Sequence, residues 1–188
     1  MSLCENFKQL WANKNFVNLV ICFALIFGVS CGIGSSLSNL LNPFGFTPSD
    51  IAMIGGACLL LGVISALVFG CILDYSAKYR QIHLSLSFLV FVAIVSIYLV
   101  MLTGDRPLKA MICVTSLMGI GFVSLFPVSL SYGAEITFPS QPSMVNACMN
   151  FSGQVCSFVV TALIIWITDI DASNDAIASE AFIERRKT

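Results

Sequence analysis

The stretch NACMNFSGQ, residues 146–154, lies inside a segment that has no charged side chain from 136 to 168. A helix needs about 20 mostly apolar residues to cross the hydrocarbon core of a membrane, so this segment is long enough. Asn146, Asn150 and Gln154 follow one another at intervals of four and therefore share one face of such a helix. Because an unpaired amide in hydrocarbon is costly, this face is predicted to adjoin other helices or a wet cavity.

Four further segments without charged side chains precede it, at residues 16–49, 51–73, 81–104 and 110–134. Only 10% of the residues are charged and 57% are hydrophobic, whereas an ordinary soluble domain has about 25% charged residues. A soluble bundle would also need charged stripes on the outward faces of its helices. We therefore predict an all-α membrane protein with five transmembrane helices, near 16–38, 51–73, 84–103, 109–132 and 143–167.

Two polar segments flank this predicted bundle, residues 1–15 and 168–188. The segments on the side of the N-terminus contain four basic residues, Lys8, Lys14, Lys78 and Arg80. The opposite short loops contain only Arg106 and Lys109. The N-terminal segment is therefore predicted to be cytoplasmic. The C-terminal tail is too rich in charge to be a sixth span. A truncated isoform, a divergent gene or a partial gene model would each explain a bundle without a sixth span.

The composition also speaks against several classes of function. We find no nucleophile–base pair, phosphate-binding glycine loop or metal-ligand cluster in the sequence. We therefore predict that the protein is not an enzyme and has no cofactor. The cysteines in the predicted spans lack C-x-x-C spacing and are interpreted as small apolar side chains. A net charge of -1 without a basic run predicts no nucleic-acid partner. We expect a multi-pass protein of the plasma membrane, with an organellar membrane as the alternative.

The loop GCILDYSAKYRQ, residues 70–81, joins the second and third predicted spans. By its spacing alone it is an ordinary polar turn. It resembles, however, the loop motif of major facilitator transporters, in which a glycine, an aspartate four residues later and following basic residues link two helices. The resemblance implies a gating role for Gly70, Asp74, Lys78 and Arg80, with Asp74 stabilising one access state of the transporter.

A longer stretch, GIGFVSLFPVSLSYGAEITFPSQPSMVNACMNFSGQ at residues 119–154, narrows the match. It is similar to the feline leukaemia virus subgroup C receptor-related branch of that superfamily in Pro127, in EITFP at 135–139 and in NFSGQ at 150–154. The resemblance implies the C-terminal half of a transporter that works by alternating access, with an N-terminal six-helix half as partner. The implied solute is a choline- or ethanolamine-like cation or a haem-related compound.

Four residues are predicted to bind the solute. The resemblance places Gln154 at the position of the family's solute-contacting glutamine, and Asn150 lies on the same helical face. Phe23 and Phe27 offer aromatic faces on which a cationic head group can bind by cation–π attraction. The alternatives are core packing for the phenylalanines and hydrogen bonds between helices for the amides, worth about 0.6 kcal/mol each.

The remaining predictions concern the gate. Glu135 is expected at the same depth as Lys78 and Arg80 and is predicted to pair with one of them in one gate position. Pro127 is predicted to kink the fourth span and to aid gating. A solvated glutamate and a static kink are the alternatives. For the whole protein, the alternative function is a non-transporting structural or accessory membrane subunit derived from a truncated transporter.

Overall fold

The computed structural model describes residues 3–76, 78–103 and 108–185, and the side chains of these residues except at 3–6, 9, 43, 74 and 171–185. Within these ranges the chain is helical between short connections. The elements, in chain order, are α1 (Leu3–Ala12), α2 (Lys14–Ser35), α3 (Leu37–Leu41), a 3₁₀ turn η1 (Asn42–Phe44), α4 (Pro48–Ser76), α5 (Tyr79–Leu102), α6 (Leu108–Ile136) and α7 (Pro142–Arg185).

Five of these helices, α2, α4, α5, α6 and α7, are long and apolar enough to cross a membrane. The predicted all-α fold with five membrane-spanning helices is therefore confirmed. The apolar part of α7 ends at Ile170, but the helix itself continues to Arg185. This continuation agrees with the sequence, which has neither glycine nor proline after Gly153 to end a helix.

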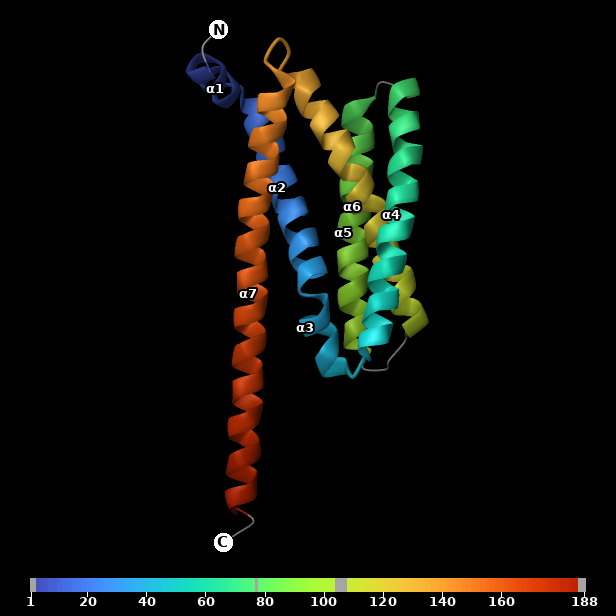
Figure 1. The fold of residues 1–188 in the computed structure, drawn as a ribbon, viewed down its shortest axis with the longest axis vertical. Helices are drawn as coiled ribbons and strands as arrows, with labels where there is room; N and C mark the ends of the chain where they lie inside the picture. The colour runs from blue at the N-terminus through green and yellow to red at the C-terminus, as the bar shows by residue number, and fades with distance from the viewer. Residues whose placement is uncertain (1–2, 77, 104–107, 186–188) are drawn as a thin grey trace.

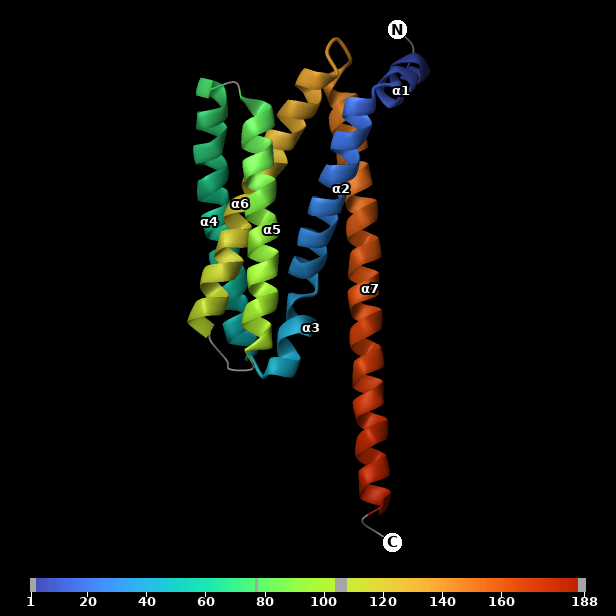
Figure 2. The same cartoon turned by 180° about the vertical axis from the view of Figure 1, so that it is seen from behind.

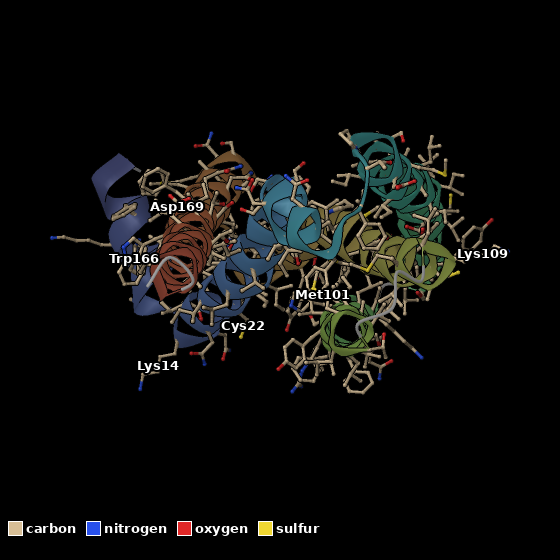
Figure 3. The ribbon with its side chains drawn as sticks, turned by 90° about the horizontal axis from the view of Figure 1, so that it is seen from below. Lys14, Cys22, Met101, Lys109, Trp166 and Asp169 are labelled. Carbon is tan, nitrogen blue, oxygen red and sulfur yellow. The ribbon has the colours of Figure 1, made fainter. Side chains whose placement is uncertain are left out.

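The helices form two groups that α6 connects (Figures 1 and 2). In one group α4 and α5 pack along α6, and in the other α2 packs along α7. The two groups lie side by side when seen along the helices, with Lys109 of α6 and Trp166 of α7 at opposite edges (Figure 3). Because α6 also contacts both α2 and α7, it holds the two groups together.

The α2–α7 pair depends on small residues. A Cβ atom added to Gly32 of α2 would lie 2.5 Å from the Cγ1 atom of Val160 on α7, and one added to Gly28 would lie 2.5 Å from the Cys156 sulfur. Glycine spaced by four residues allows two helix backbones to approach closely in a membrane. The close α2–α7 contact fixes which face of α7 is packed.

Buried hydroxyls join α4 to α6. Ser124 of α6 donates a hydrogen bond to the Ser65 hydroxyl of α4 at 2.8 Å, and the Ser65 hydroxyl lies 3.1 Å from the backbone oxygen of Ile120. Helix α4 begins with a reciprocal cap, in which the Thr47 backbone N–H donates to the Asp50 carboxylate at 3.0 Å and the Asp50 backbone N–H donates to the Thr47 hydroxyl at 3.3 Å. Such a capping box satisfies backbone donors that the first turn leaves free.

Candidate functional site

The three amides of α7 lie in different surroundings, although they share one helical face. Asn146 and Asn150 are half-buried, whereas the Gln154 side chain is exposed. The Asn146 Oδ1 atom is enclosed without a hydrogen-bond partner. Further along the helix, the Thr161 hydroxyl lies 3.1 Å from the Ser35 hydroxyl of α2. The polar face of α7 therefore meets α2 at Thr161 and is open at Gln154.

Phe23 and Phe27 of α2 lie in an aromatic cluster. They are only 1% and 8% exposed, and their rings stack with centroids 5.3 Å apart. Phe122 and Phe126 of α6 complete the cluster, with centroids 5.5 and 5.8 Å from the Phe27 ring. In this arrangement the rings pack against one another, so their faces are not free for a cationic ligand.

Gly153 is the α7 residue that meets this cluster. A Cβ atom added to it would lie 2.9 Å from a Phe27 ring carbon and 3.2 Å from a Phe23 ring carbon. The neighbouring Gln154 is turned by about 100° around the helix from Gly153, as the helical period requires. The structure thus brings the predicted phenylalanines and Gln154 to the same level of the α2–α7 pair but places them on different sides of α7.

Sequence reasoning missed the α6 part of this region. Phe122 and Phe126 are four residues apart, like Phe23 and Phe27, so their shared face was readable from the sequence. A cavity of about 300 Å³ lies beside Phe122, between α2, α4 and α6, and Ser30, Cys31 and Thr115 are among its lining residues. The Ser30 hydroxyl is buried without a hydrogen-bond partner. No sequence signal marked this hydroxyl.

The predicted gate residues partly converge. Lys78, Arg80 and Glu135 line one surface depression of about 370 Å³ at the ends of α5 and α6. These three side chains form no ion pair with one another in the described part of the chain. The side chain of Asp74 lies outside the described residues.

The other two predicted gate residues are Gly70 and Pro127. Gly70 of α4 is half-buried, and a Cβ atom added to it would have nothing within 4 Å. Pro127 lies inside α6 and is exposed. Neither residue belongs to the lining of the depression that holds Lys78, Arg80 and Glu135.

Comparison with known proteins places this arrangement in context. No family model matches the chain. Solute carrier family 49 member A3 of Xenopus tropicalis is 25% identical over 157 residues, which are 83% of this chain and 32% of that protein. The human choline/ethanolamine transporter FLVCR2 is 25% identical over 165 residues, 85% of this chain and 30% of the relative. The cat choline/ethanolamine transporter FLVCR1 is 22% identical over 84% of this chain and 28% of the relative.

The chain thus spans about a third of the length of the curated relatives that it matches, within their C-terminal half. The five apolar helices and these relatives support an integral, multi-pass membrane protein. The resemblance indicated by the 70–81 loop and the 119–154 stretch is confirmed, because the homologues of this chain are transporters of the major facilitator superfamily.

Proposed function

We propose that this chain forms the C-terminal half of a transporter that moves a small organic solute by alternating access. The observation that carries the proposal is the exposed side chain of Gln154. Gln154 lies twelve residues after the start of α7 at Pro142, or about 18 Å along the helix, which is near the middle of a membrane. An amide at this depth cannot face hydrocarbon without a large cost, so its face adjoins water, solute or another protein.

The exposure of Gln154 also supports a second wall for the pathway. Transporters of this architecture hold their solute near the bilayer midplane between two repeats. The proposed second wall is an N-terminal six-helix half, in the same full-length protein or in a partner. Gln154 and Asn150 would then face the solute from one side of the pathway.

The proposed solute is a choline- or ethanolamine-like cation, with a haem-related compound as the alternative. The support is the similarity to proteins named choline/ethanolamine transporters. Phe23 and Phe27 are proposed to contribute an aromatic face when α2 moves relative to α6, because the stacked cluster must open before a cation can reach a ring. Until then their role is to hold α7 through Gly153.

The gate is proposed at the end of the bundle where α5 begins and α6 ends. Lys78, Arg80 and Glu135 face one depression without pairing, so a small relative movement of the two helix ends would bring a cation onto the carboxylate. Such an ion pair would stabilise one access state. Gly70, Asp74 and Pro127 remain proposed parts of this gate, through the loop and the bend of α6.

The test is uptake of labelled choline, ethanolamine and a haem analogue by cells that express the protein at the plasma membrane. Replacing Gln154 with alanine removes one solute hydrogen bond, so we expect the KM to rise about two- to tenfold. The matched control is Gln141→Ala, because Gln141 is an exposed glutamine in the connection before α7. Uptake equal to that of cells lacking the protein would contradict transport. An unchanged KM in Gln154→Ala would contradict its place in the site.

A further inference from the structure

A second cavity, of about 490 Å³, lies between α2, α5 and α6. It is separate from the amide face of α7 and from the cavity beside Phe122, because its lining shares no residue with either. It lies near the bundle end where α2 and α5 begin and α6 ends, which is the end that carries the N-terminus (Figure 1).

Along α2 the lining of this cavity changes from polar to apolar. Asn15 and Asn18 lie in the first turns of α2, and Arg80 lies in the first turn of α5. Further along α2 the lining consists of Cys22 and Ile26, the latter about 16 Å from Asn15 along the helix axis. Cys22 and helix α5 lie on the same side of the molecule in the view along the helices (Figure 3). The α2 side of the cavity therefore has the polarity profile of a lipid at a membrane surface, with a polar outer end and an apolar inner end.

His83 supplies a hydrogen-bond acceptor between these two ends. It is 6% exposed and lines the cavity one turn inside Arg80. The Ser129 hydroxyl lies 2.7 Å from the carbonyl oxygen of Leu125, which can only accept, so the single hydroxyl proton is used there. The contact of 3.1 Å between Ser129 and the His83 Nδ1 atom must then be donated by Nδ1–H. When the imidazole is neutral, the Nε2 atom then carries no proton and can accept a hydrogen bond. No described residue donates to it.

The charge of the lining selects an anionic group at the outer end. Arg80 is the charged residue among the lining residues, none of which is a carboxylate. Glu135 lines the adjoining depression that also contains Arg80, but it does not line this cavity. A guanidinium binds a phosphate through charge-assisted hydrogen bonds that are stronger than those between neutral groups.

We propose that this cavity binds a lysophospholipid, a single-chain phospholipid with a free hydroxyl on its glycerol. In such a lipid the phosphate, the glycerol hydroxyl and the acyl chain follow one another in the order that the cavity requires. Arg80 holds the phosphate, Nε2 of His83 accepts a hydrogen bond from the hydroxyl, and the chain lies along Cys22 and Ile26. A phospholipid with two chains lacks this hydroxyl, because both chain-bearing positions of its glycerol are esterified.

The protein variants test the two ends of the cavity. Binding of oleoyl lysophosphatidylcholine with a photoreactive acyl chain is measured on the purified protein in lipid nanodiscs. We expect Arg80→Ala to weaken binding about tenfold, as the loss of a charged hydrogen bond would. Lys78→Ala also removes one positive charge, two residues earlier and just before α5, but Lys78 does not line the cavity, so binding is expected to remain unchanged. An equal loss in both variants would overturn the proposal, because surface charge alone would then explain binding.

At the inner end, Cys22→Phe fills the chain site and is expected to abolish labelling. Ile21→Phe is the matched control, because the adjacent Ile21 is 51% exposed and does not line the cavity. Both proteins must elute from size-exclusion chromatography like the parent protein. If folded Cys22→Phe is labelled as strongly as Ile21→Phe, the chain lies elsewhere and the proposal is wrong.

Matched ligands test the hydroxyl and the source of the phosphate. The 2-O-methyl ether of the same lipid keeps the head group and chain but has no hydroxyl proton, so it is expected to bind about two- to tenfold more weakly. Glycerophosphocholine, which lacks the chain, is expected to compete poorly. Equal binding of the ether would overturn the role of His83. Strong competition by glycerophosphocholine would identify a soluble phosphate ester in place of a lipid.

Discussion

Replacing Gly32 with alanine is expected to separate α2 from α7. The added Cβ atom would lie 2.5 Å from the Val160 Cγ1 atom and 3.1 Å from the Val160 Cβ atom. Carbon atoms in favourable contact are about 3.5–4.0 Å apart, so the overlap with Cγ1 is about 1 Å or more. A side chain that is too large for its site costs about 1–3 kcal/mol. Alanine in a helix regains up to about 1 kcal/mol relative to glycine.

Gly34→Ala in the same helix isolates the packing term, because its Cβ atom would have nothing within 4 Å. Both variants gain helix propensity, but only Gly32→Ala meets Val160. We therefore expect the free energy of unfolding of Gly32→Ala to be about 1–3 kcal/mol lower than that of Gly34→Ala. At about 2–4 °C per kcal/mol, the melting temperatures in detergent should differ by about 2–12 °C.

A double-mutant cycle assigns the loss to this contact. Val160→Ala removes the Cγ1 atom, so Gly32→Ala should cost about 1 kcal/mol less in the Val160→Ala background than in the parent protein. The melting temperature of each variant is measured by loss of monodisperse protein after heating. If Gly32→Ala and Gly34→Ala have the same melting temperature, α2 and α7 do not pack closely at Gly32. The rotation of α7 that exposes Gln154 would then no longer be supported.

Two further substitutions test the ends of other helices. Thr47→Ala removes the reciprocal cap with Asp50 and should lower the free energy of unfolding by about 1 kcal/mol, measured as a lower melting temperature. Ser49→Ala is the control, because it removes the hydroxyl that contacts the Thr47 hydroxyl at 2.8 Å but leaves the bonds between Thr47 and Asp50 in place. An equal fall in melting temperature in both variants would contradict the cap. Glu135→Lys should slow solute uptake by removing the proposed gate pair, and the added Arg80→Glu exchange should restore part of the rate. Normal uptake by both single variants would exclude the pair.

The sequence was most informative about properties that depend on composition and helical period. The absence of charge over five long segments predicted five membrane-spanning helices, because each must satisfy its backbone hydrogen bonds within itself. The four-residue spacing of Asn146, Asn150 and Gln154 placed the amides on one face, since the helical period does so in any helix. The sequence motifs also indicated a resemblance to the major facilitator superfamily, to which the homologues of this chain belong.

The phenylalanines show where sequence patterns become ambiguous. Phe23 and Phe27 have the spacing expected both of a cation-binding face and of a packed core, so the sequence cannot separate the two. The structure shows that Phe122 and Phe126 of α6 occupy their faces. That contact joins residues about a hundred positions apart, and local spacing carries no information about it.

The sequence by itself therefore determined which described helices are long and apolar enough to cross a membrane and which residues share a face of each helix. Only the tertiary structure decided which faces are covered. Gln154 is exposed and Gly153 is buried because the close approach of α7 to α2 at Gly28 and Gly32 sets the rotation of α7 about its axis. His83 and Arg80 likewise meet Cys22 in one cavity because of how α2, α5 and α6 pack. Helical periodicity is a property of one helix, whereas the packing partner of each face depends on all of them.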